Sequence, residues 1–141
     1  MGEQPVSYIE QSGVIPYQLI DGKIAVLLIT SRKRKRWVIP KGIIEPDMTA
    51  QDSAAQEAWE EAGVIGEMLP NLIGSYTYRK WGGICRVKVF LLRVERLQSD
   101  WLENYRERQW LSIPEAVERV QEMELKEILM NLSKVLVQLA D

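Results

Sequence analysis

The chain has 141 residues, of which 46% are hydrophobic and 27% are charged, and its net charge is -2. This length and balance fit one globular domain with a buried core, so we expect residues 1–141 to form a single domain whose first residues, 1–11, are loose. The composition argues against a disordered chain, and the slight negative charge argues against a general nucleic-acid coat or a membrane-surface protein.

The first predicted elements are two strands joined by a tight turn. Residues 12–20 are expected to form a strand that is broken at Pro16, and Asp21-Gly22 is a hairpin turn signal. Residues 23–30 form a continuous apolar run, which is typical of a central strand buried on both faces.

A loop, a short strand and a helix follow. The unbroken basic run 32–36 is expected to be a loop, and residues 37–39 a short strand. After a second loop, Thr49 is a suitable N-cap for a helix that runs to Ala62, and Gly63 is the expected C-terminal stop.

The C-terminal half predicts more strands and then helices. Pro70-Asn71 is expected to interrupt the strand region 64–78, and alternation predicts another strand over 84–94. Later elements are a strand at 110–111, a short helix from Ile113, and one long amphipathic helix over 122–140. Strands, a helix, more strands and a final helix together indicate an α/β layered domain with a mixed sheet.

The helix that ends at Gly63 carries three carboxylates on one stripe. Glu57 lies three residues before Glu60 and four before Glu61, and these spacings place side chains on one face of a helix. A solvated acidic face is the ordinary alternative. No lysine or arginine on this helix offsets the charge.

The residues available for chemistry are limited, because the sequence contains no histidine and a single cysteine. This excludes histidine-based triads and histidine-rich zinc sites, so metal or acid–base chemistry must rest on carboxylates, which suit hard cations. Cys85 lies in an alternating apolar run typical of packing. It cannot form an internal disulfide, which suits a reducing compartment, and with no apolar leader we expect a cytoplasmic protein without membrane contact.

The carboxylates belong to a longer pattern, PKGIIEPDMTAQDSAAQEAWEEAGV, which resembles the Nudix box. The family pattern is Gly, five residues, Glu, seven residues, then Arg-Glu-aliphatic-any-Glu-Glu-any-Gly-aliphatic. Here Gly42 opens the box, Glu57, Glu60 and Glu61 match its later glutamates, and Gly63 lies near its end. The resemblance implies a Nudix-like α/β/α sandwich and a hydrolase that acts on acid anhydrides in phosphorus-containing compounds.

The resemblance also implies the site residues. It assigns a Mg²⁺ (or Mn²⁺) ion to the Gly42 carbonyl and to Glu57, Glu60 and Glu61, which are also the catalytic glutamates. The general base remains open between one of these ligands and a glutamate outside the box. Glu107 is the candidate outside the box, with a solvated loop charge as its alternative reading.

Two positions depart from the family pattern. Met48 stands where the pattern has its first glutamate, although Glu45 lies close enough to serve part of that role. Gln56 stands where the family has an arginine that orients the carboxylates, and a neutral amide cannot offset their charge. We expect these changes to alter metal affinity while leaving the ligands themselves intact.

Basic residues near the box predict a substrate with several phosphates. Arg34, Arg36, Lys41 and Arg79 are the candidate contacts, although a basic run is also typical of a soluble hairpin tip. The segment 34–46 most resembles the family branch that handles diadenosine and diphosphoinositol polyphosphates.

Two alternatives remain for the function. One is another Nudix activity on a nucleotide sugar or on the 5′ end of RNA, the latter being the only nucleic-acid partner we expect. The other is a Nudix-like domain that senses a nucleotide without cleaving it. Apart from that RNA end, the expected partner is a small-molecule phosphoanhydride substrate, and the sequence does not predict the oligomeric state.

Overall fold

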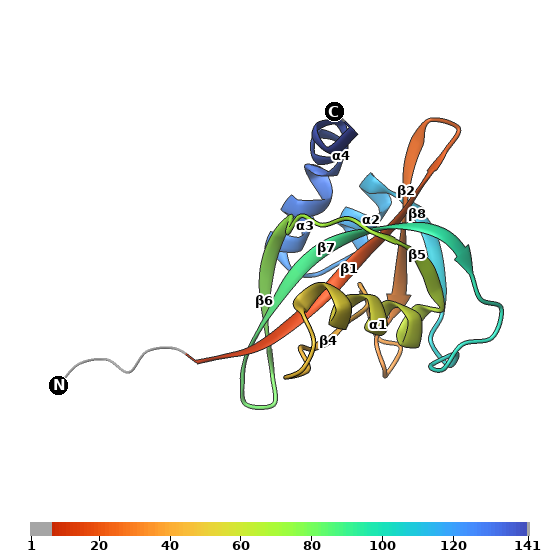
Figure 1. Cartoon of the computed structure of the whole chain (residues 1–141). Helices are drawn as coiled ribbons and strands as arrows, with labels where there is room; N and C mark the ends of the chain where they lie inside the picture. Colours follow the sequence, from red (N-terminus) through yellow and green to blue (C-terminus); the bar gives the residue numbers. More distant parts are fainter. Residues whose placement is uncertain (1–6, 141) are drawn as a thin grey trace.

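The computed structural model describes residues 7–140, which fold around one mixed β-sheet (Figure 1). Its strands are β1 (Tyr8–Ile20), β2 (Lys23–Thr30), β3 (Trp37–Val38), β4 (Lys41–Ile43), β5 (Val64–Met68), β6 (Gly74–Lys80), β7 (Gly83–Leu97) and β8 (Arg108–Ser112). Its helices are α1 (Ala50–Ala62), α2 (Ile113–Arg119), α3 (Met123–Met130) and α4 (Leu132–Ala140).

The sheet is mixed because its two longest strands run parallel. The main strand order is β3-β2-β1-β7-β5, with β4 paired to β1, β6 to β7 and β8 to β2. β1 pairs with β7 in parallel, while the other pairs are antiparallel. The predicted mixed sheet is confirmed.

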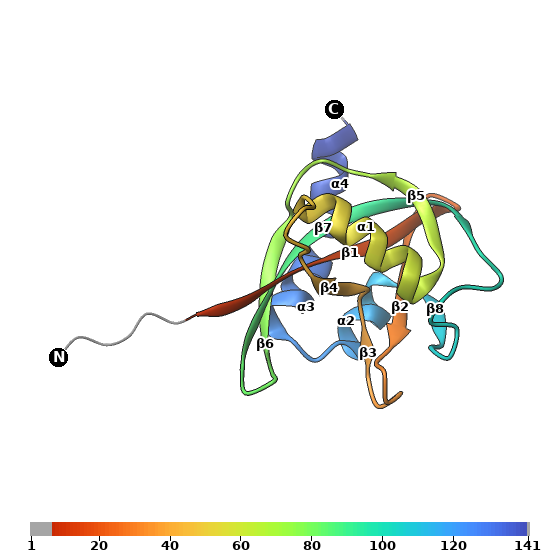
Figure 2. The same cartoon turned by 60° about the horizontal axis from the view of Figure 1, so that its bottom comes forward.

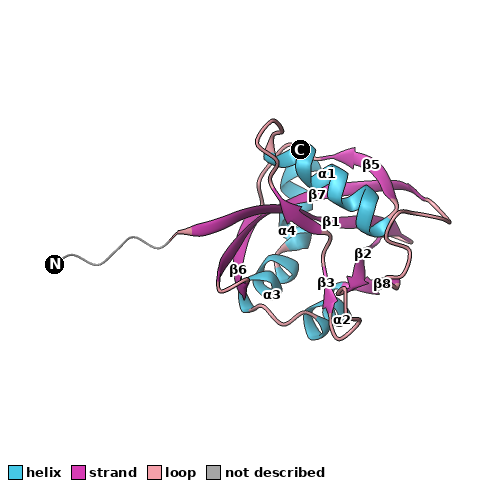
Figure 3. Cartoon of the chain, turned by 90° about the horizontal axis from the view of Figure 1, so that it is seen from below, coloured by secondary structure: helices cyan, strands magenta, loops and turns pink. Residues whose placement is uncertain are grey.

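Helices cover both faces of the sheet, as expected for an α/β/α sandwich (Figure 3). In β2, Val26 and Leu28 pack with α2 and α3 on one face, whereas Leu27 and Ile29 pack with α1 on the other. Successive strand side chains point to opposite faces, so a continuous apolar run serves two cores at once. The prediction that residues 23–30 are buried on both faces is confirmed for Val26 to Thr30.

Helix α1 begins and ends where local signals predict. The Thr49 hydroxyl accepts a hydrogen bond from the Asp52 backbone N–H at 3.0 Å, which caps the N-terminus. Gly63 has φ 65°, the left-handed conformation that ends a helix and that a residue with a Cβ adopts at a cost. Ala54, Ala58 and Ala62 are fully buried, so the helix lies close against the sheet.

The prediction that the first strand breaks at Pro16 is wrong. β1 is continuous, and Pro16 pairs in register with Leu92 of β7. The opposite edge of β1 explains how a proline is tolerated: β4 pairs with residues 11–13, β2 pairs from Tyr17 onward, and Pro16 falls between them. The Val14 N–H, two residues earlier, donates along that edge to the Pro40 carbonyl at 3.1 Å. The missing N–H of Pro16 therefore costs no ladder hydrogen bond.

Strand boundaries differ at two further places. β1 begins at Tyr8, so residues 8–11 are part of the sheet rather than loose, while residues 1–6 of the predicted loose segment lie outside the described part of the chain. Residues 42 and 43, expected as part of the loop 42–48, belong to β4, which pairs with Gln11 to Gly13 of β1. This pairing places Gly42 in the sheet, opposite Ser12 of β1.

The prediction of a single long C-terminal helix is also wrong, because Asn131 separates α3 from α4. Asn131 has φ -92° and ψ 3°, and its side-chain Nδ2 donates to the Glu127 carbonyl at 3.0 Å. A short amide side chain that bonds the nearby backbone competes with helix propagation. Across residues 7–140, none of the helices is both long and apolar enough to cross a membrane.

Candidate active site

A cleft of about 750 Å³ is lined by the β6–β7 hairpin, the β2–β3 loop and α1, among other segments. The hairpin and the loop project on the same side of the molecule (Figure 2). Six segments line it: Gln11 of β1, the β2–β3 loop with Val38, the stretch 41–45, the C-terminal half of α1, the β6–β7 hairpin, and the β7–β8 loop. Segments far apart in the sequence therefore meet at one place, as a ligand site requires.

The predicted metal ligands lie together in this cleft. Glu57, Glu60 and Glu61 of α1 all line it, and so does Gly42 of β4. A Cβ added to Gly42 would stand 2.3 Å from the Glu57 carboxyl carbon, so only glycine allows this approach. The structure thus places the opening glycine of the box against its first later glutamate.

The β7–β8 loop fixes the end of α1 that carries Glu60 and Glu61. The last carbonyls of a helix have no partner inside the helix and need one elsewhere. Here the loop and the start of β8 supply three donors: the Glu103 N–H to the Glu60 carbonyl at 3.0 Å, the Trp101 Nε1 to the Glu61 carbonyl at 3.0 Å, and the Arg108 Nη1 to the Ala62 carbonyl at 2.8 Å. The carboxylates therefore sit at a helix end whose last carbonyls are capped.

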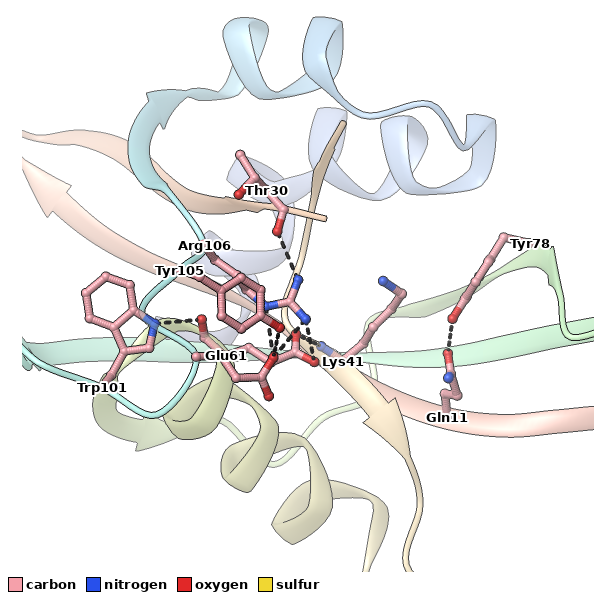
Figure 4. A network of polar contacts seen from close by, with 9 residues as sticks. Gln11, Thr30, Lys41, Glu61, Tyr78, Trp101, Tyr105 and Arg106 are labelled. Carbon is pink, nitrogen blue, oxygen red and sulfur yellow. Dashed lines mark hydrogen bonds and ion pairs between the residues drawn. The ribbon is translucent and has the colours of Figure 1, made fainter. Parts of the chain in front are cut away.

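The same loop brings two residues into the cleft that the sequence did not reveal. Glu103 and Arg106 both line it, and the Arg106 guanidinium lies between Thr30 and the carboxylates of Glu61 and Glu103 (Figure 4). Glu107, the predicted outside glutamate, is exposed and does not line the cleft; its backbone pairs with Thr30. The charged residues between positions 103 and 108 were the only signal in the sequence for these contacts. The conformation of the loop decides which of them line the cleft.

Burial and repulsion perturb the ionisable groups on the acidic side of the cleft. Burial, followed by repulsion from Glu61 and Glu60, raises the pKa of Glu57 to about 8. Burial also raises the pKa of Glu61, opposed by Arg106 and Lys41. Burial lowers the pKa of Lys41 to about 8, although Glu61 opposes this shift. Perturbed groups gathered in one cleft are a common property of active sites.

Basic side chains line the same cleft as the carboxylates. Of the predicted substrate contacts, Arg36, Lys41 and Arg79 line the cleft, whereas Arg34 does not and donates instead to the Tyr105 carbonyl. Arg36 is also engaged, since its Nη1 lies 3.3 Å from Glu122 Oε2. Other basic residues of the lining are Arg32, Lys33 and Lys35 of the basic run 32–36, Lys80 of the β6–β7 hairpin, and Arg106. Eight basic and five acidic residues line the cleft, so it favours an anionic ligand although the chain as a whole is slightly acidic.

The donor set of the cleft fits a hard divalent cation. Mg²⁺ and Mn²⁺ prefer oxygen ligands such as carboxylates and backbone carbonyls, and the cleft offers both. Because Gly42 has no Cβ, the Glu57 carboxylate can lie close to the backbone of β4. Within residues 7–140, no three acidic, histidine or cysteine side chains converge on one point. The carboxylates therefore have to move closer together to share an ion.

The two departures from the box have local consequences. The Gln56 side-chain amide donates to Glu60 Oε1 at 3.1 Å, so it contacts one carboxylate but adds no charge. The Met48 N–H donates to the Glu45 carbonyl at 3.1 Å in the loop before α1, and Glu45 lines the cleft. Glu45 is thus near the site, as expected.

These features define a class of protein: a small α/β/α domain with a carboxylate-bearing helix end facing a basic cleft. The model of the NUDIX domain matches residues 11–132, and the chain belongs to this family. The family generally uses divalent metal cations. The resemblance inferred from the box is confirmed over nearly the whole described chain.

Named relatives agree with this assignment. Nudix hydrolase 13, mitochondrial, of Arabidopsis thaliana is 35% identical over 130 residues, which cover 76% of this chain and 64% of that protein. Diphosphoinositol polyphosphate phosphohydrolase 3-alpha of Mus musculus is 34% identical over 99 residues, which cover 68% of this chain and 59% of that protein. The chain thus spans less than two thirds of the length of these two relatives. It carries a NUDIX domain.

Solved structures confirm the fold. The Ap4A hydrolase of C. elegans superimposes with a TM-score of 0.79 at 22% identity, over 92% of this chain and 99% of that chain. The NUDIX domain of Shewanella oneidensis NrtR, solved with ADP ribose, gives a TM-score of 0.66 at 13% identity, over 92% of this chain and 89% of that chain. The predicted Nudix-like sandwich with a mixed sheet is confirmed.

Proposed function

We propose that this domain hydrolyses a phosphoanhydride bond in a small, phosphate-rich substrate with the help of Mg²⁺ or Mn²⁺. The observation that carries the proposal is a cleft lined both by the carboxylate end of α1 and by two basic loops. A phosphoanhydride is densely anionic, and its own charge repels a nucleophile. A site that hydrolyses it needs both cationic contacts for the phosphates and groups that handle a cation and a proton.

The residues divide into two sets with different tasks. Glu57, Glu60, Glu61 and the Gly42 carbonyl would hold the cation, which when bound neutralises phosphate charge and acidifies water at the site. Arg79 and the other basic residues of the lining would bind the phosphates that flank the scissile bond. The Glu61 side chain is 12% exposed, and its reduced contact with water strengthens its electrostatic effect.

Glu103 is our candidate for the general base. Its Oε1 accepts hydrogen bonds from the Arg106 Nε and Nη2 and from the Tyr105 hydroxyl, at 2.9 to 3.1 Å. Among the described residues, no donor contacts its Oε2, which is therefore available to accept a proton from water in the cleft. Glu103 lines the cleft and Glu107 does not, so the structure favours Glu103 over the residue chosen from the sequence.

The basic lining supports a substrate with several phosphates. The mouse relative is named for diphosphoinositol polyphosphates, and the C. elegans structure is that of an Ap4A hydrolase. Both names describe substrates richer in phosphate than a simple nucleotide. We therefore place diadenosine and diphosphoinositol polyphosphates first among the substrates to test.

The test is a panel of substrates in the presence of Mg²⁺ or Mn²⁺. It contains dinucleoside polyphosphates, diphosphoinositol polyphosphates, nucleotide sugars and RNA with a 5′-triphosphate. We expect cleavage of the first two classes and a rate loss of about a hundredfold or more in Glu60→Gln. Glu67→Gln, an exposed glutamate of β5, is the matched control and should retain the wild-type rate. Preferred cleavage of sugar nucleotides or RNA would move the proposal to that substrate class.

A domain that binds a nucleotide without cleaving it is the second candidate. It is favoured by the separation of the carboxylates and by Gln56 in place of the family arginine. The sensing function would replace hydrolysis if the protein binds a dinucleoside polyphosphate but does not cleave it with any divalent metal. In that case Glu60→Gln should bind the nucleotide as tightly as the wild type.

A further inference from the structure

Arg106 is the most buried charged side chain at the cleft, with an exposed fraction of 7%. Its Nη1 donates to the Thr30 carbonyl of β2 at 2.9 Å, which ties the guanidinium to the sheet (Figure 4). A buried guanidinium is stable only when its donors are satisfied and its charge is matched. Its position is therefore fixed by contacts on both sides.

The other side of the guanidinium meets two carboxylates. Its Nε and Nη2 lie 3.1 Å and 2.9 Å from Glu103 Oε1, and Nη2 lies 3.8 Å from Glu61 Oε2. The second oxygen of Glu61 accepts from the Lys41 backbone N–H at 3.2 Å. One rigid fork thus sets the orientation of a glutamate on α1 relative to a glutamate on the β7–β8 loop.

Gln56, at the box position where the family has arginine, does not make this contact. Gln56 is exposed and lies directly before Glu57 in α1, and its side-chain amide donates to Glu60. We propose that Arg106 is a positioning residue that supplies from the β7–β8 loop the charged contact to the carboxylates that Gln56 cannot supply from the helix. The inference rests on the cation site of the proposed function.

A positioning role and a purely electrostatic role predict opposite results. If Arg106 only adds positive charge near the site, its removal should strengthen the binding of a divalent cation, because one repulsive charge is lost. If it orients Glu61 and Glu103, removal should weaken binding, since contacts that orient metal ligands are worth about 10- to 100-fold in metal affinity.

The experiment measures Mn²⁺ binding to the full chain by calorimetry and electron paramagnetic resonance, without substrate. We expect Arg106→Met to weaken Mn²⁺ binding by about tenfold or more. Arg106→Lys should also weaken it, because lysine keeps the charge but lacks the fork. Gln56→Arg introduced into Arg106→Met should recover part of the lost affinity. Arg93→Met removes an exposed arginine of β7 and is the matched control, with unchanged affinity expected.

The outcomes separate this inference from the proposed function. If wild type binds no Mn²⁺, the cation site itself is refuted, and the role of Arg106 with it. If wild type binds Mn²⁺ and both Arg106 variants bind it equally or more tightly, only the positioning role is refuted. Circular dichroism checks folding, and if Arg106→Met is unfolded, Arg106→Lys decides. Failure of Gln56→Arg to recover any affinity would refute the equivalence of the two positions.

Discussion

Replacing Gly42 with alanine tests the close contact between β4 and α1. The added Cβ would stand 2.3 Å from the carboxyl carbon and Oε1 of Glu57, whereas ordinary contacts begin near 3.4 Å. The Glu57 carboxylate must therefore move by about 1 Å. Because the Gly42 φ is not positive and the displaced group is the end of a flexible side chain, we expect the free energy of unfolding to change by less than about 1 kcal/mol.

The catalytic effect of Gly42→Ala should be much larger than its effect on stability. A misplacement of about 1 Å at a reacting site can lower the rate by about a hundredfold. The assay compares kcat with the urea unfolding midpoint, for Gly42→Ala and for Gly83→Ala. An added Cβ at Gly83 meets nothing closer than 3.6 Å, so this control should match wild type in both measurements. A Gly42→Ala protein with wild-type kcat would refute the argument that Glu57 needs its observed position.

Three further perturbations follow from the charges and caps of the cleft. The raised pKa of Glu57, about 8, means that this group stabilises the metal-free protein below about pH 4.5 and that the contribution is lost as pH rises to about 8. Cation affinity should increase over the same window, with proton release measurable by calorimetry; a pH-independent affinity would contradict this. Trp101→Phe removes the donor to the Glu61 carbonyl and should lower the free energy of unfolding by about 1 kcal/mol in urea titrations, while Trp81→Phe, at an exposed site, should not. Arg79→Ala should raise KM for a polyphosphate by about two- to fivefold without changing kcat, and the difference should shrink at high salt. A larger change in kcat than in KM would argue against a phosphate contact.

Elements with strong local signals were predictable from the sequence. Helix α1 was predicted from its Thr49 cap to its Gly63 stop, because both ends depend on residues within one helical turn. The turn at Asp21-Gly22 and the buried run of β2 follow for the same reason. The placement of Gly42 with the three box glutamates depends on spacing within one short segment, and this too was predictable.

Features that depend on distant contacts were not predictable. Pro16 fits inside β1 only because β2 and β4 leave a gap along one edge, and no local pattern reveals that gap. Arg106 reaches Thr30, which lies 76 positions earlier, through a loop without regular structure. The choice between Glu103 and Glu107 depends on the same loop. The sequence therefore predicts the acidic half of the site better than the contacts that orient it.

The central claim is that water attacks a phosphorus atom within this carboxylate-lined cleft. The direct measurement is mass spectrometry of products formed from a dinucleoside polyphosphate in water labelled with a heavy oxygen isotope, with Mg²⁺ present. We expect one labelled oxygen in one of the two phosphate products, and no products when Glu57→Gln replaces the wild type. Products that carry no label, or equal labelling and rate with Glu57→Gln, would contradict the account.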